Sequence, residues 1–322
     1  MPTKYFSEDS QGTLRMKIFN SIEEIENIRP CCIALGNFDG VHAGHQALIR
    51  KAVEKAKELG IASGVFTFSN HPKNLFAGEN TVKNIIYQEE KAALIAELGV
   101  DYLFNVEFTW DVARMEPEDF IDKLLVEKMN LKEAFCGFNY RFGSKAAGNP
   151  DVLRQRGLEK GYNVNEIAPV TVDGDVVSST LIRGLIRSGD VDQCEKYLGR
   201  RYSIGGEVVV GNRLGRTIGF PTSNIMIDEN MVTPPNGVYI TNCIYNGQKY
   251  RSVTNVGVKP TIGTFQKNME THIFNFNKEL YGKHIQVEFL KMTRDEAKFS
   301  SVEELAAQIV KDCEEAKAYH GL

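Results

Sequence analysis

The sequence predicts an α/β doubly wound domain followed by an antiparallel β-barrel with a C-terminal helix, and three observations support this. The chain has 322 residues, which is enough for two domains of ordinary size. Apolar strand patterns alternate with helical patterns up to about residue 188. After Gly199 the pattern changes to short runs rich in Val, Ile, Tyr and Phe, separated by turn residues. We therefore expect a first domain over residues 16–188, a connecting segment over 189–198 and a second domain over 199–322.

The composition indicates a soluble globular protein, because 42% of the residues are hydrophobic and 25% are charged. The net charge of −4 gives no reason to expect nucleic acid or an anionic membrane as a partner. No apolar run approaches the length of a membrane span. The six cysteines form neither a CxxC pair nor a metal-ligand pattern, so reduced thiols in the cytoplasm are the simplest interpretation. Residues 1–15 lack the basic start and apolar core of a signal peptide, and we expect a disordered N-terminal extension there.

The first domain opens with a strand pattern, a glycine-rich turn and a helix. Apolar residues 32–35 lead into GNFDGVHAGH over residues 36–45, and apolar residues recur at three- and four-residue steps from Gln46 onward. Strands and helices that alternate in this way predict a parallel sheet whose functional residues gather at the carboxyl ends of its strands. Further strands are expected at residues 61–68, 102–106, 134–136 and 164–167, and further helices at 87–98, 117–129 and 150–160.

The turn carries His42 and His45, which flank Gly44 and lie three residues apart. At the start of a helix, a nucleotide phosphate can meet backbone N–H groups, and Gly44 lets the backbone approach it closely. The alternative is a half-formed metal site or a pair of surface histidines. That alternative is weakened because no cysteine or carboxylate cluster stands nearby to complete a metal shell.

A second polar segment, VSSTLIR over residues 177–183, lies where another helix begins. Its serines and threonine can cap that helix, and the N–H groups of the same turn can bind phosphate. Arg183 follows Thr180 by three residues, so the two side chains share a helix face.

The second domain reads as short strands joined by turns, which predicts an antiparallel barrel because closure removes exposed strand edges. The pairs Asn236-Gly237 and Asn246-Gly247 are strong turn signals, and the second has the form of a hairpin turn. A final helix should begin after Ser300 or Ser301 as its cap, with its apolar face packed on the barrel. The expected strands are residues 205–210, 223–227, 238–245, 249–256, 270–276 and 285–290.

The stretch GNRLGRTIGFPTSN over residues 211–224 has too many glycines to be a packed strand or helix throughout. It can bring backbone N–H groups close to an anion, with Arg213 and Arg216 to neutralise the charge. The hydroxyl of Thr222 and the amide oxygen of Asn224 are hard donors suited to Mg²⁺ beside a phosphate. The alternative is a glycine-rich hairpin that binds nothing, and the spacing is not that of a Walker loop.

These separated motifs resemble those of one enzyme family. Residues 211–224 resemble the G…GR.hGhPT[AS]N signature of riboflavin kinases. Residues 42–45 resemble the HxGH motif of class-I nucleotidyltransferases. Residues 177–183 are similar to the ISSTxxR motif of the FMN adenylyltransferase module that is fused to this kinase in bacterial bifunctional FAD synthetases. The resemblance covers nearly the whole chain from about Met16. It implies a nucleotidyltransferase fold for the first domain and a six-stranded Greek-key barrel for the second.

The resemblance implies an adenylylation site in the first domain. His42 and His45 would bind nucleotide phosphates and stabilise charge that develops at the α-phosphorus, and Arg183 would help to hold the triphosphate. Two looser matches add residues that would line this site, although either residue can be a turn residue instead. They are His71, in a TFSNHP segment with Asn70 where the family has proline, and Asn139, in GFNYRFG. The implied nucleotide-binding residues are Gly36, Phe38, Asp39, Gly40, Gly44, His71, Asn139, Ser178, Ser179 and Thr180.

The resemblance also implies a kinase site in the second domain. Glu270 lies in METHIFNF, which is similar to the ExHhhDF segment whose glutamate is the base for the riboflavin 5′-hydroxyl, whereas an isolated strand glutamate is usually a surface residue. Asn275 stands where the family has aspartate. Arg294 falls in a stretch similar to LRxExKF and is implied to contact the flavin. The implied nucleotide-binding residues are Gly211, Arg216, Gly219, Pro221, Thr222 and Asn224, of which Thr222 and Asn224 would also bind the metal.

The family resemblance therefore implies a cytoplasmic enzyme with two ATP-dependent activities. The barrel would phosphorylate riboflavin to FMN and ADP with Mg²⁺, and the α/β domain would transfer AMP from a second ATP to FMN, giving FAD and pyrophosphate. One alternative is a chain that retains a single activity, but both sets of motifs are intact. The other is a non-catalytic flavin-binding protein, which would not need two triphosphate sites.

Overall fold

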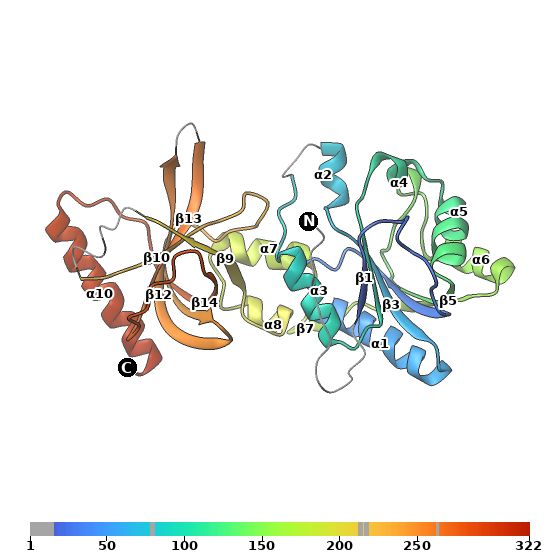
Figure 1. Cartoon of the computed structure of the whole chain (residues 1–322), viewed down its shortest axis with the longest axis horizontal. Helices are drawn as coiled ribbons and strands as arrows, with labels where there is room; N and C mark the ends of the chain where they lie inside the picture. Colours follow the sequence, from blue (N-terminus) through green and yellow to red (C-terminus); the bar gives the residue numbers. More distant parts are fainter. Residues whose placement is uncertain (1–15, 78–80, 212–214, 216–218, 262–263) are drawn as a thin grey trace. The chain divides into compact units, whose positions relative to one another are not determined.

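The computed structural model describes residues 16–77, 81–211, 215, 219–261 and 264–322 (Figure 1). The chain divides between Val177 and Ser178 into two compact units. No helix within the described residues is long and apolar enough to cross a membrane.

The first unit is built on a six-stranded sheet in which every neighbouring pair of strands is parallel, as the alternating pattern predicted. The strand order is β1-β4-β3-β2-β5-β6, so the chain runs outward from β2 through β3 to β4 and then returns to the other side of β2. The carboxyl ends of β2 and β5 therefore flank the point at which the strand order reverses, where open α/β sheets bind their ligands. The strands are β1 (Lys17–Phe19), β2 (Cys31–Leu35), β3 (Ala62–Phe68), β4 (Tyr102–Val106), β5 (Leu131–Gly137) and β6 (Asn163–Ile167).

Helices cover both faces of this sheet. Helix α1 (Ala43–Leu59) packs on β2, β3 and β5 from one side. On the other side, Cys31 and Ile33 point into a core that includes Phe120 and Leu153. Cys32 is buried on the opposite face, as expected for adjacent residues in a strand. The other helices of this unit are α2 (Pro72–Ala77), α3 (Gln88–Glu97), α4 (Trp110–Arg114), α5 (Pro117–Asp119), η1 (Phe120–Lys128), the 3₁₀ turn η2 (Ser144–Ala146) and α6 (Pro150–Lys160).

The helix expected over residues 117–129 forms, but most of it is not an α-helix. After three α-helical residues it continues as a π-helix, η1, which ends with a hydrogen bond from Met129 N to Leu124 O, five residues apart, at 3.0 Å. The buried side chains of η1 would also make the apolar stripe of an α-helix, so the sequence pattern did not distinguish the two forms. These side chains are Phe120, Ile121, Leu124 and Leu125.

The second unit begins with two helices, α7 (Ser179–Ser188) and α8 (Cys194–Leu198). Between them, Gly189 has a φ of 90° and its α-carbon faces Met292 and Pro235, where a Cβ atom would come within 2.9 Å of the Met292 sulfur. A small two-stranded hairpin, β7 (Thr171–Val172) and β8 (Asp175–Val176), closes the first unit.

Six antiparallel strands form a closed barrel in the order β10-β13-β12-β11-β14-β9, as predicted. Strands β11, β12 and β13 are consecutive neighbours and β14 returns beside β11, which is the Greek-key arrangement. The predicted hairpin turn is confirmed, since Asn246 and Gly247 both have positive φ (49° and 73°) between β11 and β12. The strands are β9 (Ser203–Val209), β10 (Ser223–Met226), β11 (Gly237–Tyr245), β12 (Gln248–Thr261), β13 (Thr264–Ile273) and β14 (His284–Asp295).

The C-terminal helix α10 (Val302–His320) lies against the barrel (Figure 1). Ser301 caps it by accepting a hydrogen bond from the backbone N–H of Glu304 at 3.1 Å, which confirms one of the two predicted caps. Cys313 and Ala316 on its inner face are buried in a core to which the barrel contributes Val238, Ile240, Val253, Phe274 and Leu290.

All six cysteines lie within the described residues and are free and buried. Burial raises the pKa of each thiol, to about 11 at Cys32 and to about 12 at Cys243.

Candidate active sites

The loop between β2 and α1 is strained. Phe38 and Val41 have φ of 49° and 39°, and Gly40 between them has φ of 87°. The left-handed region costs roughly 1–3 kcal/mol for a residue with a side chain, and most for a β-branched one. Both side chains are at most 1% exposed, so packing in the core holds this conformation. Strained turns of this kind occur where backbone groups must face a ligand.

The two histidines of the turn lie at the N-terminus of α1. The Nδ1 atom of His42 accepts a hydrogen bond from the backbone N–H of His45 at 3.3 Å, and His42 is thereby the N-cap of the helix. In its neutral form His42 then carries its proton on Nε2, which is a donor. The two rings stack with centroids 3.5 Å apart, and the His45 ring also contacts the edge of Phe38. A Cβ at Gly44 would lie 3.3 Å from the His42 ring, so glycine leaves room for this stack.

Asp39 is buried, and its side chain connects the turn to the backbone at Ile85. Its carboxylate accepts hydrogen bonds from the backbone N–H of Ile85 at 2.9 and 3.2 Å. Gln46 adds a hydrogen bond from its amide to the carbonyl of Val41 at 2.9 Å. Gly36 directly follows β2 and is the first residue of the same turn. The structure therefore gives Asp39 a clear role in holding the turn.

A buried lysine extends this support. The ammonium of Lys91 on α3 donates to the carbonyl of Phe68 at 2.8 Å and to the hydroxyl of Thr67 at 3.4 Å. Thr67 in turn donates to the carbonyl of Asn37 at 2.8 Å. Burial lowers the pKa of Lys91 to about 8, against an opposing effect of the nearby Asp39 carboxylate. The network ties the end of β3 to the turn after β2.

His71 and Asn139 follow β3 and β5, at the carboxyl ends of the parallel strands. The Nδ1 atom of His71 accepts from the backbone N–H of Lys73 at 3.2 Å, at the start of α2. Asn139 lies in the turn after β5, with its amide oxygen close to Gly137. Asn70, which stands where the family has proline, makes hydrogen bonds of 2.7 and 3.1 Å to the backbone of Phe108. These bonds fix the loop that a proline would otherwise stiffen.

Helix α7 starts as the capping pattern predicted. The hydroxyl of Ser178 accepts from the backbone N–H of Leu181 at 3.2 Å, so Ser178 is the N-cap. Ser179 and Thr180 follow in the first turn, and Arg183 is 8% exposed one turn later.

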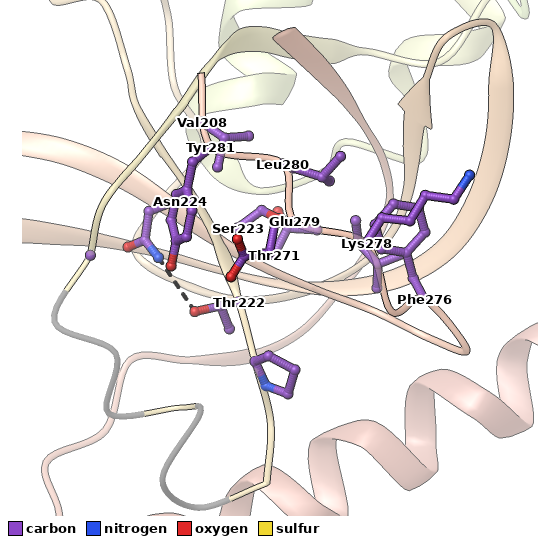
Figure 2. Close-up of a pocket in the computed structure, with 13 residues that line it drawn as sticks. Val208, Thr222, Ser223, Asn224, Thr271, Phe276, Lys278, Glu279, Leu280 and Tyr281 are labelled. Atoms are coloured by element: carbon purple, nitrogen blue, oxygen red, sulfur yellow. Dashed lines mark hydrogen bonds between the residues drawn. The ribbon is translucent and has the colours of Figure 1, made fainter. Parts of the chain in front are cut away.

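In the barrel, Thr222 and Asn224 line one pocket. Figure 2 shows the two side chains pointing toward one another, with a hydrogen bond of 3.4 Å from the Asn224 amide to the Thr222 hydroxyl. A Cβ at Gly211 would come within 2.6 Å of the Asn224 amide, so only glycine fits there. Gly219 has a φ of 87°. The other lining residues are Val208, Pro221, Ser223, Thr271, Ile273, Phe276, Lys278, Glu279, Leu280 and Tyr281.

Glu270 does not line this pocket, but strand pairing puts it beside Asn224. In the β10–β13 ladder Asn224 is opposite Glu270, so their side chains lie on the same face of the barrel wall. Asn268 donates from its amide to the Glu270 carboxylate at 3.4 Å. The structure thus places Asn224 on β10 beside Glu270 on β13, with Thr222 directly before β10. Arg213 and Arg216 lie outside the described residues.

Arg294 is engaged with the C-terminal helix. Its guanidinium makes two hydrogen bonds to the carboxylate of Asp312, at 2.9 and 2.7 Å, and lies over the ring of Phe299 at 5.9 Å. This bidentate pair ties β14 to α10 and raises the pKa of Arg294. Asn275, just after the end of β13, has a φ of 55°, a conformation that asparagine tolerates better than most residues.

The sequence alone did not single out a cluster of exposed aromatic side chains after β3 and β4. Phe76 and Trp110 are 60% and 48% exposed and meet edge to face at 5.5 Å. Phe108 contacts Phe76 at 6.0 Å and joins the pair to Phe68 on β3. In a sequence, aromatic residues of this kind look like core residues. The feature that could have marked them as exposed was their position in polar segments directly after strands.

Comparisons with known proteins find two families in succession along the chain. A family model described as FAD synthetase matches residues 24–181, which include Ser178, Ser179 and Thr180, and one described as riboflavin kinase matches residues 198–320. The bifunctional riboflavin kinase/FMN adenylyltransferase of Haemophilus influenzae is 36% identical, covering 91% of this chain and 95% of its own length. That of Escherichia coli is 34% identical, covering 95% and 99%.

A solved structure shows the same two-part fold. It comes from Streptococcus pneumoniae and is named a macrolide-efflux protein, with a TM-score of 0.84 and 31% sequence identity. The match covers 94% of this chain and 98% of that one, so it extends over both units.

Proposed function

The chain belongs to the family of bifunctional riboflavin kinase/FMN adenylyltransferases, and on that premise we propose which of its residues carry each reaction. It phosphorylates riboflavin to FMN with ATP and adenylylates FMN with a second ATP to give FAD. The observation that carries this is the presence of both family domains in series, each with its own set of motif residues.

His42 and His45 serve adenylyl transfer. An oxygen of the FMN phosphate attacks the α-phosphorus of ATP, and the bond from that phosphorus to the β-phosphate oxygen breaks to release pyrophosphate. The FMN phosphate is already anionic, so the reaction needs no strong base, and stabilisation of developing charge dominates. The Nε2 donor of His42 and the helix N-terminus beside it support this role.

Further residues bind the nucleotide. Gly36, Phe38, Gly40 and Gly44 belong to the strained turn that carries the histidines, and Asp39 holds it in shape. Ser178, Ser179, Thr180 and Arg183 bind the triphosphate, a role supported by the place of Ser178 at the N-cap of α7, of Ser179 and Thr180 in its first turn and of Arg183 one turn later. The FAD synthetase match includes the first three of these residues and ends just before Arg183. His71 and Asn139 line the site from the loops after β3 and β5.

The exposed aromatic cluster receives the isoalloxazine ring of FMN. Flat aromatic ligands stack on exposed aromatic side chains, which bury a large area with little loss of side-chain entropy. Phe76 and Trp110 follow β3 and β4 at the carboxyl ends of the parallel sheet, where such folds bind their ligands. Their exposure supports the assignment, because a core role would bury them.

Glu270, Thr222 and Asn224 serve phosphoryl transfer. Glu270 accepts the proton of the riboflavin 5′-hydroxyl while the 5′-oxygen bonds to the γ-phosphorus of ATP. The bond from that phosphorus to ADP breaks in the same step. Gly211, Gly219 and Pro221 shape the phosphate-facing segment, and Arg216 adds charge to it. The role of Glu270 is supported by its position on β13, directly opposite Asn224 on β10.

The Thr222 hydroxyl and the Asn224 amide oxygen are the residues that would hold Mg²⁺. The two side chains line the same pocket, with the Asn224 amide nitrogen 3.4 Å from the Thr222 hydroxyl. Two neutral hard-oxygen ligands in one pocket suit an ion that keeps other positions for phosphate and water. Among the described residues no cluster of three His, Cys, Asp or Glu side chains offers a competing metal site. When bound, Mg²⁺ neutralises charge on the phosphates.

Replacing both His42 and His45 with alanine tests the assignment. The parent enzyme incubated with riboflavin and Mg-ATP should yield FMN and FAD, resolved by chromatography. The double variant should accumulate FMN and form FAD at least about 10²-fold more slowly, the effect typical of losing a charge-stabilising donor. A folded double variant that makes FAD at the parental rate would contradict the assignment. A parent that makes neither product would instead favour the non-catalytic alternative.

A further inference from the structure

We propose that His272 is a positioning residue of the kinase reaction, and that it holds the segment carrying Thr222 against the strand carrying Glu270. The inference rests on the proposed roles of Thr222 and Glu270. It deepens them by identifying what keeps the two in register.

A side-chain hydrogen bond joins these two parts of the chain. The Nδ1 atom of His272 lies 2.8 Å from the carbonyl oxygen of Pro221. A carbonyl only accepts, so Nδ1 carries the proton and donates. Pro221 has no N–H group, and its carbonyl is therefore the polar backbone group through which this residue can be tied down.

The bond lies where the regular ladder stops. Pairing between β10 and β13 begins with Ser223 opposite Thr271, so His272 is the next residue on β13 after the last paired position. Thr222 is the corresponding next residue toward Pro221, and it makes no ladder pair with β13. The imidazole thus extends the attachment past the end of the ladder, to the stretch that contains Thr222.

The ring of His272 is itself fixed by packing. It meets Phe220 edge to face at 5.6 Å and Phe274 at 5.5 Å. Burial lowers the pKa of His272, so the imidazole is neutral at pH 7, with its proton on Nδ1. A packed neutral ring with one directed donor is suited to holding a backbone carbonyl in one place.

The position matters because His272 stands two residues after Glu270 on the same strand. Residues two apart in a strand point to the same side, so one strand face carries both the proposed base and the anchor of the phosphate-facing segment. A displacement of about 1 Å between catalytic groups can cost on the order of 10²-fold in rate. Losing the anchor should therefore slow phosphoryl transfer without removing any reacting group.

Three substitutions separate this role from simple packing. His272→Phe keeps the ring between Phe220 and Phe274 but removes the donor. His272→Asn places an amide nitrogen the same number of bonds from the α-carbon as Nδ1, whereas His272→Gln places it one bond further out. Each variant would be assayed for riboflavin phosphorylation and, separately, for FAD formation from supplied FMN.

We expect His272→Phe to lower the kinase kcat about 10- to 100-fold and to raise the KM for ATP, with FAD formation from FMN unchanged. His272→Asn should recover to within about five-fold of the parent, and His272→Gln should not. The proposal fails if the Phe variant phosphorylates riboflavin at the parental rate, or if Asn and Gln are equally active. If the Phe variant does not fold, the Asn and Gln pair decides alone. Failure of the parent to make FMN would instead reject the proposed function itself.

Discussion

At the scale of single residues, Glu270 obtains its position from strand pairing rather than from its local sequence. On the two adjacent strands it pairs with Asn224 of β10 and Asn255 of β12. On its own strand, the amide of Asn268 donates a hydrogen bond to its carboxylate. A carboxylate among amides stays hydrogen-bonded and can still accept a proton from a nearby alcohol. The surroundings of its carboxylate thus come from residues that lie up to 46 positions away.

Glu270→Gln should therefore make FAD from FMN but almost none from riboflavin. Glutamine keeps the shape and hydrogen bonding of the side chain and removes its basicity, and loss of a general base typically costs ~10²- to 10⁴-fold in kcat. Steady-state assays of each reaction with its own substrate measure the difference. The KM values for riboflavin and ATP should change much less.

A kinase rate within a few-fold of the parent would show that Glu270 is a structural strand residue. The FAD-forming reaction is the internal control, because none of the residues proposed for it is Glu270 or a residue of the barrel, and it should proceed at the parental rate in the same preparation.

Residue-scale features were predictable from sequence where they depend on neighbours in the chain. The caps at Ser178 and Ser301 satisfy N–H groups three residues away, and both were expected. The bond from His272 to Pro221 joins positions 51 residues apart, and nothing local signals it. Arg294 matched a flavin-side motif, but its partner Asp312 became visible only once α10 was placed on the barrel.

At the scale of elements, the loops after β3 and β4 carry the aromatic cluster assigned to FMN. Phe76→Ala should raise the KM for FMN in the adenylylation reaction at least about five-fold, since an aromatic contact is worth about 1 kcal/mol. The KM for riboflavin in the kinase reaction should not change, because that site is built from the barrel.

Leu59→Ala is the matched control, because Leu59 is also a half-exposed apolar residue of the first unit (47% exposed) but lies at the far end of α1. An unchanged KM for FMN in Phe76→Ala, or an equal rise in Leu59→Ala, would remove the cluster from the flavin site.

Elements with a strong period were predicted well, and short or irregular ones were not. The strand at residues 102–106 and the helix at 150–160 have the expected bounds. Helices α2 and α4 have six and five residues, too few for a 3.6-residue repeat to show. The π-helix η1 differs from an α-helix in its backbone hydrogen bonds, which leave little trace in the pattern of apolar residues.

At the scale of the whole molecule, all the residues proposed for the kinase reaction belong to the second compact unit, and we expect its barrel to work alone. A fragment of residues 199–322 should fold and phosphorylate riboflavin, since it contains all six strands of the closed barrel and α10. A longer fragment of residues 178–322 should melt at a higher temperature, because Tyr197 and Leu198 in α8 are buried and burying such side chains contributes roughly 1.5–3 kcal/mol each.

Circular dichroism and a riboflavin phosphorylation assay on both fragments test this. A folded short fragment without activity, alongside an active longer one, would mean that α7 and α8 are needed for the kinase site. Two folded but inactive fragments would mean that the first unit contributes to it.

The buried cysteines also make the free energy of unfolding depend on pH in the alkaline range. An unfolded thiol ionises near pH 8.5, whereas the native pKa is raised, to about 11 at Cys136 and about 12 at Cys194. The native state thus binds more protons than the unfolded state above pH 8.5. The free energy of unfolding should be steady with respect to these groups below about pH 8 and fall as the pH rises through 9 and toward 12.

Labelling of the same six thiols can show which of the two units has unfolded. Three lie before the division at Val177 (Cys31, Cys32 and Cys136) and three after it (Cys194, Cys243 and Cys313). Only an exposed thiolate reacts with a disulfide reagent, so the folded protein should stay unlabelled. In rising urea, intact mass should increase by three labels and then by six if the units open separately, as their separate cores lead us to expect. A single jump from none to six would show that they unfold as one.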